Sequence, residues 1–317
     1  MKPIMIMMCG LVGSGKSYYA QELAQKYNAN IHSSDAIREE LSGDVNNQNI
    51  NDLVFKTLHS RIKEDLKNGK NCIYDATNLS YKKRMSFLQE LKNIECIKIC
   101  IFMATPYEEC LARNSARDRV VPEHVIKRMY MSFDPPAYYE GWDSIRIEYS
   151  ENSKNSKGSI MNFVKDVMNY SQDNSHHKLT LGGHILSVYQ NILDPMFDSS
   201  IVECQKYFLI YRELIVASLL HDCGKPFAKT FTNTKGKITE QAHYYNHEHC
   251  GSYDIFFYEM PEEINLFKVA LLVRWHMQPY FWEKDNNEKQ HNKYRKLWGE
   301  KMYQDIMRLH KADKEAH

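Results

Sequence analysis

A glycine-rich segment near the start of the chain, Gly10–Ser17, reads GLVGSGKS and fits the pattern of a phosphate-binding loop. An apolar run at 4–9 precedes it and a helical pattern follows. The glycines let backbone N–H groups turn toward phosphate oxygens, and the following helix adds its positive end. We therefore expect Lys16 to reach the β- and γ-phosphates of ATP and Ser17 to bind Mg²⁺. The residues expected at the nucleotide are Gly10, Gly13, Ser14, Gly15, Lys16 and Ser17.

Two charged residues, Asp35 and Arg38, follow the second predicted strand at 30–33. A carboxylate at Asp35 either caps the next helix or accepts the proton of a hydroxyl that attacks the γ-phosphate. Arg38 lies one helical turn further on the same face. Its guanidinium either holds a phosphate of the substrate or lies in solvent. The sequence leaves both pairs of alternatives open.

Further charged residues follow the next strands. Asp75 ends the apolar run at 72–74 and is placed to orient Mg²⁺. Three arginines then cluster at Arg113, Arg117 and Arg119, before Pro122. Such a cluster is either a solvated helix end or a closing lid that neutralises charge on a transferred phosphoryl group.

Histidines concentrate in the other half of the chain, with three before residue 150 and eleven after it. Several of them end apolar helical patterns that would converge in one bundle. The adjacent pair His221-Asp222 offers an imidazole nitrogen beside a hard oxygen, a mixture that suits Mn²⁺, Fe²⁺, Co²⁺ or Ni²⁺. The candidate metal-ligating residues are His184, His221, Asp222, His247, His276 and Asp313.

The elements that must position these residues differ between the two halves. Strands alternate with helices up to residue 150, which predicts an α/β domain with a parallel sheet covered on both faces. We expect strands at 4–9, 30–33, 71–74, 95–103 and 145–149, and helices at 16–27, 35–41, 51–68, 81–92, 106–114 and 122–131. The phosphate-binding loop, residues 32–35, residues 75–78 and Thr105 all fall at the carboxyl ends of these strands.

A polar stretch at 151–158 then marks a boundary, and the pattern turns helical. We predict a first domain over 1–150, a linker over 151–159 and an all-α domain over 160–317. Its expected helices cover 160–170, 179–193, 202–220, 262–276 and 294–312. A small β-hairpin is predicted between 231 and 241.

Composition limits the class of protein. The 317 residues carry a formal net charge of +1, so contact with nucleic acid would depend on local Lys and Arg patches. The 8 cysteines include no Cys-x-x-Cys pair, which favours reduced core residues and a cytoplasmic protein. We find no apolar run long enough for a membrane span and expect no membrane partner.

Residues 1–150 resemble the phage-type 5′-hydroxyl polynucleotide kinases. The resemblance rests on the loop Gly10–Ser17, the element Ser34-Asp35-x-x-Arg38, Asp75-Ala-Thr-Asn78, and the lid from Arg113-Asn-Ser-Ala-Arg117 through Pro122 to Arg128-Met-Tyr. It implies transfer of the ATP γ-phosphate to a 5′-OH end of RNA or DNA. Asp35 would then be the general base, Arg38 would bind the acceptor's phosphate, and the lid residues Arg113 and Arg117 would contact the ATP phosphates.

Residues 175–315 resemble the HD phosphohydrolase superfamily of helical metal-dependent enzymes. His184, His221, Asp222 and Asp313 match its four core ligands, and His247 and His276 match the positions that two-metal members add. The resemblance gives Lys225 a role in binding a substrate phosphate, with capping of a helix as the alternative.

Other histidines are assigned less closely. His243 and His249 compete with His247 for the metal, and His176 and His177 are placed at the pocket. We expect His291, His310 and His317 on the surface.

The two resemblances together predict an RNA end-healing enzyme. It would phosphorylate 5′-OH ends and remove a 2′,3′-cyclic or 3′ phosphate, leaving ends suited to an RNA ligase. Two alternatives stay open. One is a small-molecule or nucleoside kinase fused to a nucleotide phosphohydrolase, and the other is a kinase whose second domain binds RNA without catalysis.

Overall fold

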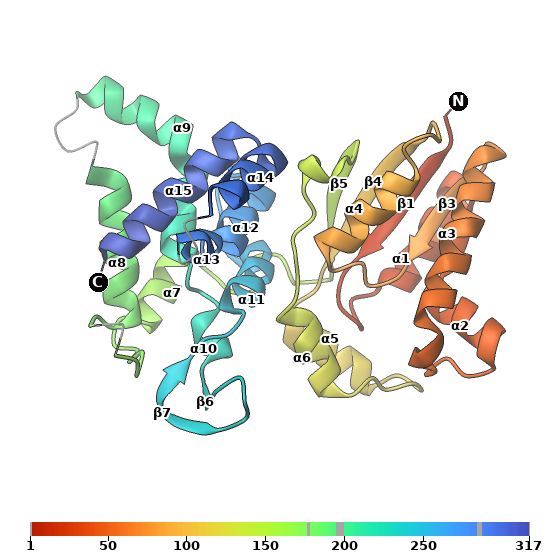
Figure 1. Cartoon of the computed structure of the whole chain (residues 1–317), viewed down its shortest axis with the longest axis horizontal. Coiled ribbons are helices and arrows are strands. Elements are labelled where there is room, and N and C mark those ends of the chain that lie inside the picture. The colour runs from red at the N-terminus through yellow and green to blue at the C-terminus, as the bar shows by residue number, and fades with distance from the viewer. Residues whose placement is uncertain (1, 176–177, 195–199, 284–286, 317) are drawn as a thin grey trace. The chain divides into compact units, whose positions relative to one another are not determined.

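The computed structural model describes residues 2–175, 178–194, 200–283 and 287–316. Their contacts divide the chain into two compact units (Figure 1). The first comprises Met1–Met129 and Pro136–Ser153, and the second comprises Tyr130–Pro135 and Lys154–His317. The units thus differ from the predicted division at residue 150 mainly in Tyr130–Pro135, which pack with the second unit.

The first unit is built on a five-stranded sheet with the order β2-β3-β1-β4-β5. Every neighbouring pair of strands is parallel. The strands are β1 (Ile4–Cys9), β2 (Ala29–Ser33), β3 (Asn71–Asp75), β4 (Ile97–Ala104) and β5 (Ser144–Tyr149). The predicted parallel sheet is confirmed. Loops that follow β1, β2, β3 and β4 therefore share one edge of it.

Helices cover both faces of this sheet. They are α1 (Lys16–Tyr27), α2 (Ser34–Ser42), α3 (Asn51–Lys67), α4 (Tyr81–Glu90), α5 (Tyr107–Ser115) and α6 (Glu123–Tyr130). Alternate residues of a strand point to opposite faces. Ile73 of β3 packs in a cluster with Leu23 of α1. Its neighbour Tyr74 contacts Phe87 of α4 and His59 of α3, so these two helices lie on the other face.

The second unit is mainly helical. Its helices are α7 (Ile160–Asp166), α8 (Leu181–Leu193), α9 (Ile201–Leu220), α10 (Lys225–Ala228), α11 (His247–Asp254), α12 (Leu266–Trp275), α13 (Gln278–Glu283), α14 (Glu288–Trp298) and α15 (Glu300–Glu315). The helices α8, α9, α11, α12 and α15 pack together as its core. Two short strands, β6 (Thr230–Thr232) and β7 (Ile238–His243), form the expected antiparallel hairpin.

Several helix predictions for this unit are wrong in extent. The helix expected over 294–312 is two helices, α14 and α15, separated at Gly299, whose φ of 81° lies in the left-handed region. The helix expected from 262 begins at Leu266, where the side chain of Asn265 accepts the N–H of Lys268 as a cap. The short helices α11 and α13 were not predicted. No helix among the described residues is both long enough and apolar enough to span a bilayer.

Candidate active site and candidate metal centre

The glycine-rich loop joins β1 to α1, as its pattern predicts. Gly13 has φ 83°, and a Cβ there would lie 2.4 Å from the carbonyl oxygen of Cys110. Gly15 has φ 88° and directly precedes α1. A side chain at Gly13 would clash with the backbone of Cys110, and the left-handed φ at Gly15 also favours glycine. The loop therefore keeps the tight curvature that a phosphate-binding backbone requires.

Lys16 is buried at the base of this loop. Its ammonium donates to the carbonyl oxygen of Leu11 at 2.7 Å and to Ser14 Oγ at 3.4 Å. Burial lowers the pKa of Lys16 from its usual value, while the carboxylate of Asp75 opposes that shift. The cation is thus fixed among oxygens of the loop that would surround the β- and γ-phosphates.

Ser17 and Asp75 form the second polar pair of the loop. Ser17 Oγ donates to Asp75 Oδ2 at 2.8 Å, and Asp75 ends β3, the neighbour of β1 in the sheet. A hydroxyl and a carboxylate are the hard oxygen donors that Mg²⁺ prefers. These two side chains fit the predicted magnesium site.

Asp35 lies in the first turn of α2, with both carboxylate oxygens in ion pairs. Arg38 Nη1 donates to Oδ1 at 2.7 Å, and Arg119 Nη1 donates to Oδ2 at 2.8 Å. Arg38 is buried, also donates to Asn51 Oδ1, and leaves its Nε without a partner among the described residues. The side chain of Asp35 is 50% exposed, so its oxygens remain reachable from the cleft.

Arg119 was predicted only as a member of the arginine cluster, without a role at Asp35. It reaches 84 positions back along the chain to Asp35, and it also donates to Asn46 Oδ1 and to the carbonyl oxygen of Val45. In the sequence, its place two residues after Arg117, in the same lid, was the only indication of a role in the site. Asp35 is therefore held between two guanidinium groups, not one.

The lid between α5 and α6 carries the remaining arginines. Arg113 pairs with Glu109 on α5, whereas Arg117 is exposed. The side chain of Asn114 both donates to the carbonyl oxygen of Val121 and accepts its N–H, and so closes this loop. These two hydrogen bonds between Asn114 and Val121 hold together the ends of the loop that carries Arg117 and Arg119.

A cleft of about 1130 Å³ brings the predicted kinase residues together. Loop, base candidate and lid all contribute to its wall, which includes Gly13, Gly15, Lys16, Ser17, Asp35, Arg38, Asp75, Arg113, Arg117 and Arg119. Gly10 and Ser14 complete the loop behind this wall. The wall also includes Lys83 and Arg128, which were not assigned as site residues.

A buried ion pair supports the loop from behind. Arg84 donates from Nε and Nη2 to the two carboxylate oxygens of Glu140, and both side chains are 0% exposed. Arg84 Nη1 also donates to the carbonyl oxygen of Asn78 at 2.9 Å. The amide of Asn78 in turn donates to the carbonyl oxygen of Met8 at 2.8 Å. This chain of contacts fixes the end of β1, where the loop begins.

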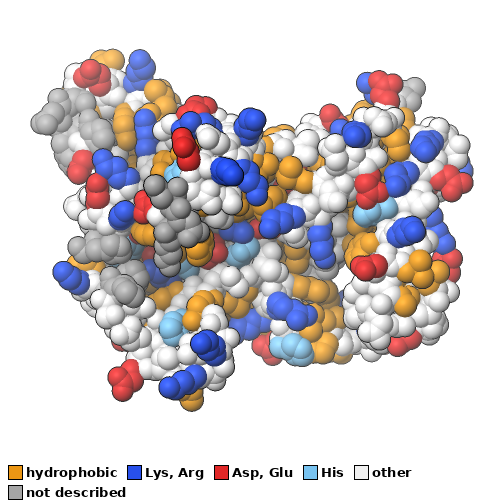
Figure 2. All heavy atoms as spheres, viewed as in Figure 1, with side chains coloured by type: hydrophobic (Ala, Val, Ile, Leu, Met, Phe, Trp, Pro, Cys, Tyr) orange, Lys and Arg blue, Asp and Glu red, His pale blue; other side chains and the backbone are white. Residues whose placement is uncertain are grey.

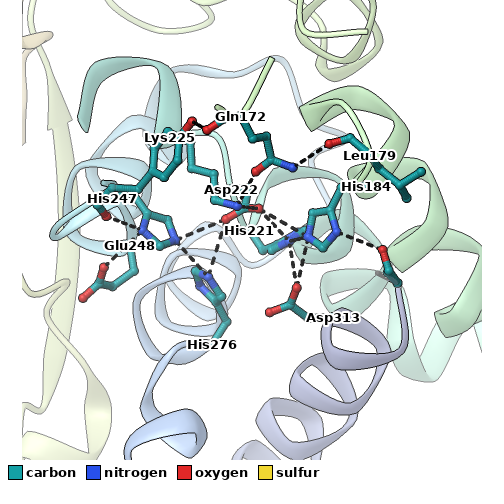
Figure 3. Close-up of polar contacts among 12 residues, drawn as sticks. Gln172, Leu179, His184, His221, Asp222, Lys225, His247, Glu248, His276 and Asp313 are labelled. Carbon is teal, nitrogen blue, oxygen red and sulfur yellow. Dashed lines mark hydrogen bonds and ion pairs between the residues drawn. The ribbon is translucent and has the colours of Figure 1, made fainter. Parts of the chain in front are cut away.

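The six candidate metal ligands of the second unit converge in one buried cluster (Figure 3). They come from α8, from the residues just after α9 and α12, from the first residue of α11, and from α15. His184, His221 and Asp313 form one group of facing ligand atoms, and Asp222, His247 and His276 form a second. Within each group the ligand atoms lie within 4.8 Å of one another.

Asp222 links the two groups. Its Oδ2 lies 3.3 Å from His221 Nε2, and its Oδ1 lies 3.2 Å from His247 Nε2. Asp313 Oδ1 lies 3.0 Å from His184 Nε2 on the first side. One carboxylate thus offers an oxygen to each group, as a ligand shared by two cations would.

The imidazoles are oriented by backbone carbonyls. His221 Nδ1 lies 2.9 Å from the oxygen of Ser218, His247 Nδ1 lies 2.8 Å from that of Tyr244, and His276 Nδ1 lies 2.6 Å from that of Val273. A carbonyl oxygen accepts only, so each Nδ1 carries the proton and each Nε2 presents a lone pair to the cluster. Ligating histidines are typically oriented in this way. The donor set therefore fits one or two divalent cations.

The ionisation states of Asp222 and His276 agree with binding of a cation. Burial, together with the neighbouring imidazoles of His247 and His221, lowers the pKa of His276 to about 4 and favours its neutral form. Burial opposes ionisation of Asp222, but its charged neighbours, Lys225 foremost, outweigh burial and hold the pKa of Asp222 well below its usual range. Burial also opposes the charged form of His221, but the carboxylates of Asp222 and Asp313 outweigh it and raise the pKa of His221, so a bound cation would displace that proton. Neutral imidazole and ionised carboxylate are the states that bind a cation.

Lys225 lies at the edge of the cluster. Its ammonium is 2.7 Å from Asp222 Oδ2 and donates to Gln172 Oε1 at 2.8 Å. The side chain is buried beside Asp222 and does not extend into solvent. Gln172, which the sequence reasoning missed, fixes this ammonium.

The other described histidines of the second unit lie outside the metal-ligand cluster. His249 Nδ1 lies 2.8 Å from the carbonyl oxygen of Phe133, and His243 contacts Thr239, so His247 alone of the three faces the ligands. His310 is buried against Glu283, which corrects its predicted surface position. His291 is partly buried, and its Nδ1 lies 2.9 Å from Tyr303 Oη. His176, His177 and His317 lie outside the described residues.

Comparison with known proteins covers the first unit. Residues 5–136 match the family model of the AAA domain. A 169-residue stretch is 28% identical to the L-seryl-tRNA(Sec) kinase of Methanococcus maripaludis, and the match covers 52% of this chain and 66% of that one. Residues 5–136 form a P-loop domain of the kinase type. The match spans just under two thirds of that relative's length, so the relative's substrate does not establish the substrate of this chain.

Solved structures show more distant likenesses. A putative kinase from Chloroflexus aurantiacus has a TM-score of 0.41 at 16% identity, over 48% of this chain and 90% of that one. The Pnkp1/Rnl/Hen1 RNA repair complex has a TM-score of 0.34 at 21% identity, over 40% of this chain and 42% of that one. At these scores the likenesses carry no argument about substrate.

Proposed function

We propose that this chain is a bifunctional RNA end-healing enzyme. The first unit phosphorylates 5′-OH polynucleotide ends with ATP, and the second removes a 2′,3′-cyclic or 3′ phosphate with the help of divalent transition metals. The single observation that carries the first activity is the pair of guanidinium groups around Asp35, in the cleft of the phosphate-binding loop. That arrangement supports a role for Asp35 as the base, with the guanidinium groups beside it as binding groups for the acceptor's phosphate.

The kinase step assigns each side chain of the cleft a role. Asp35 accepts the proton of the acceptor's 5′ hydroxyl as its oxygen bonds to the γ-phosphorus, and the bond to the β-phosphate oxygen breaks to release ADP. Lys16, Arg113 and Arg117 offset negative charge on the transferred group. Ser17 and Asp75 would hold Mg²⁺, which supplies further charge neutralisation when bound.

Acceptor selection falls to Arg38. Its buried guanidinium is anchored by Asn51, and its unpartnered Nε leaves a donor for a phosphate oxygen. A polynucleotide end carries a phosphate next to its terminal hydroxyl, whereas a free nucleoside does not. We therefore expect the enzyme to favour a nucleoside 3′-phosphate over the nucleoside.

The test of the kinase is phosphate transfer from labelled ATP to a 5′-OH oligonucleotide. Asp35→Asn keeps the size of the side chain but removes its basicity, so kcat should fall by roughly 10²–10⁴-fold. Full activity of this variant would assign Asp35 a capping role and overturn the mechanism. Equal activity on a nucleoside and its 3′-phosphate would remove the acceptor role of Arg38 and favour a small-molecule kinase.

The hydrolase proposal rests on the facing lone pairs of the buried cluster. The cluster's six side chains would hold a divalent cation, and the chemistry such a cation supplies when bound is to lower the pKa of a coordinated water toward about 7. The chain's own part is to hold His184, His221, Asp222, His247, His276 and Asp313 in the required protonation states. Lys225 lies beside Asp222, where it could bind a phosphate oxygen of the substrate.

The hydrolase is tested through metal content as well as activity. Elemental analysis of the purified protein should find Mn, Fe, Co or Ni, and the variant His221→Ala with Asp222→Ala should lack it. Phosphate release from 2′,3′-cyclic and 3′-phosphorylated RNA should be lost in the same variant. Absence of a transition metal, with no phosphate release after metal addition, would make the second unit a binding module.

A second candidate acceptor follows from the similarity to the L-seryl-tRNA(Sec) kinase, whose name describes a kinase of serine attached to transfer RNA. The acceptor hydroxyl of this chain would then lie on an aminoacyl group. Seryl-tRNA and a 5′-OH oligonucleotide, offered in competition for the same ATP, distinguish the two. We expect phosphate on the oligonucleotide.

A further inference from the structure

A small hairpin interrupts the helices of the second unit at the edge of the metal centre. Strands β6 and β7 pair antiparallel, and the segment before them carries Lys225 while the segment after them begins α11 at His247. The hairpin is therefore joined at both ends to residues of the cluster (Figure 1). The ligand set does not require such an insertion, so the hairpin needs another explanation.

Cations and aromatic rings alternate from the cluster outward to this hairpin. The ammonium of Lys225, bonded to Asp222, lies 5.5 Å from the ring centroid of Tyr244. Lys229, one helical turn after Lys225, lies 4.7 Å from the ring of Tyr170 and 5.9 Å from that of Phe231. We call these five residues the basic–aromatic track.

Exposure rises along this track. Lys225 is buried, Tyr244 and Tyr170 are partly buried, and Phe231 is 42% exposed. Lys229 is held by the carboxylate of Asp173, at 2.6 Å. The track thus connects the buried metal centre with a surface that solvent reaches.

Basic side chains also lie at the turn of the hairpin. Lys235 and Lys237 are exposed at its turn, and neither has an ion pair among the described residues. Ile238, next to Lys237, is 78% exposed. At the other end of β7, Tyr245, whose ring stacks on His243 at 5.2 Å, is 38% exposed. Figure 2 shows Lys or Arg side chains gathered at the turn of the hairpin.

Charge and ring content distinguish two explanations. Lysines on a two-stranded hairpin could merely prevent edge-to-edge association of strands. That purpose does not require exposed aromatic rings beside the lysines or a connection to the cluster. Segment 229–245 holds three lysines against one glutamate, so it attracts a polyanion. Lysines that meet phosphates, with rings on which bases stack, form the combination that binds single-stranded nucleic acid.

We propose that the β6–β7 hairpin and the basic–aromatic track bind the single-stranded segment of an RNA whose 3′ terminal phosphate lies at the metal centre. This inference rests on the proposed hydrolase and deepens it, because it makes a polynucleotide the preferred substrate over a mononucleotide. Lys235 and Lys237 contact backbone phosphates, and Phe231 and Tyr245 stack on bases.

The test compares two substrates with the full-length, metal-loaded enzyme: adenosine 2′,3′-cyclic monophosphate and a 12-nucleotide RNA ending in a 2′,3′-cyclic phosphate. The variant Lys235→Ala with Lys237→Ala, and separately Phe231→Ser, should lower kcat/KM for the RNA at least about fivefold. Both variants should keep kcat/KM for the mononucleotide within about twofold. The lysine variant should also flatten the slope of log kcat/KM against log salt for the RNA, by about 1.4.

A matched control is Lys296→Ala with Lys301→Ala, two exposed lysines on α14 and α15 that should leave both substrates unaffected. Equal losses on RNA and mononucleotide in the hairpin variants would show that the hairpin shapes the metal centre. No loss on RNA would show that the strand lies elsewhere. Either result overturns the inference.

Binding separates this inference from the hydrolase itself. Fluorescence anisotropy with a labelled 12-nucleotide RNA that carries phosphates at both ends should show weaker binding to the hairpin variants, at least about fivefold. If the wild type releases phosphate from neither substrate, the proposed hydrolase fails, and this measurement still decides the hairpin. Undiminished binding by the hairpin variants contradicts the inference.

Discussion

The cleft of the first unit and the cluster of the second handle charge in opposite ways. In the cleft, Asp35 is 50% exposed and Arg119 is 26% exposed, so the functional groups meet solvent and pair with one another. In the cluster, His221 is 0% exposed and Asp222 is 3% exposed, and the facing atoms are acceptors. The cleft pairs Asp35 with its own guanidinium groups, whereas the cluster turns several ligand atoms toward one another, as a site for a cation would.

This difference predicts how the two sites respond to change. Exposed ion pairs contribute little to stability, so variants of the cleft should fold normally and lose rate. Buried carboxylates that lose their partners are costly, so variants of the cluster should lose metal and stability together.

The largest expected effect separates the two activities. Lys16→Ala removes the cation of the loop and should lower 5′ phosphorylation about a thousandfold or more, with phosphate release and metal content unchanged. His221→Ala with Asp222→Ala should do the reverse. End-labelling and phosphate release, measured on the same preparations, check this. Loss of both activities in either variant would contradict the assignment of one activity to each unit.

A second prediction concerns the buried pair behind the loop. Arg84→Met leaves the carboxylate of Glu140 buried and unpaired, which should lower the free energy of unfolding of the first unit by about 3–5 kcal/mol. Urea denaturation followed by fluorescence measures this. Glu140 also accepts from Trp142 Nε1 and the N–H of Ala137. Adding Glu140→Gln to Arg84→Met removes the charge while keeping an acceptor, so this control should recover part of the loss.

The third prediction concerns metal as a source of stability. Adding Mn²⁺, Co²⁺ or Ni²⁺ to chelator-treated protein should raise the melting temperature of the second unit, since a ligand that binds only the folded state stabilises it. The first unit should respond to ATP with Mg²⁺ instead. Differential scanning calorimetry resolves the two if they melt separately. In the His221→Ala, Asp222→Ala variant the transition-metal shift should be absent; its persistence there would place the metal elsewhere.

The smallest effect is expected at Arg119. Its pair with Asp35 is partly exposed and worth up to about 1 kcal/mol, so Arg119→Ala should lower kcat/KM for the acceptor up to about fivefold. Arg38→Ala should cost more, because Arg38 is buried and fixed by Asn51. Steady-state kinetics with a 5′-OH oligonucleotide compares the two. A larger loss of kcat/KM in Arg119→Ala than in Arg38→Ala would assign acceptor binding to Arg119 and not to Arg38.

Local patterns made much of this architecture predictable. The loop Gly10–Ser17 specifies its own conformation through Gly13 and Gly15, and the alternation of strands and helices specifies the parallel sheet. The positions of several histidines at helix ends also predicted their convergence in one bundle, whereas the assignment of the full ligand set came from the resemblance.

Long-range contacts could not be predicted in this way. Arg119 meets Asp35 and Arg84 meets Glu140 across 84 and 56 positions, and no local pattern encodes either pair. Gln172 belongs to the cluster's edge only because the fold brings it to Lys225. The break at Gly299 was missed because the apolar periodicity continues on both sides of it. The buried place of His310 depends on Glu283, a partner 27 positions away.

The most direct test of the central claim uses one oligonucleotide with a 5′-OH and a 2′,3′-cyclic phosphate. It is incubated with chelator-treated protein, ATP and Mg²⁺, alone or with Mn²⁺, Co²⁺ or Ni²⁺, and both ends are analysed by mass spectrometry. The account predicts a 5′-phosphate with Mg²⁺ alone, and loss of the terminal phosphate only when a transition metal is present. A 5′ end left unphosphorylated, or a 3′ end left unchanged with every metal, would contradict it.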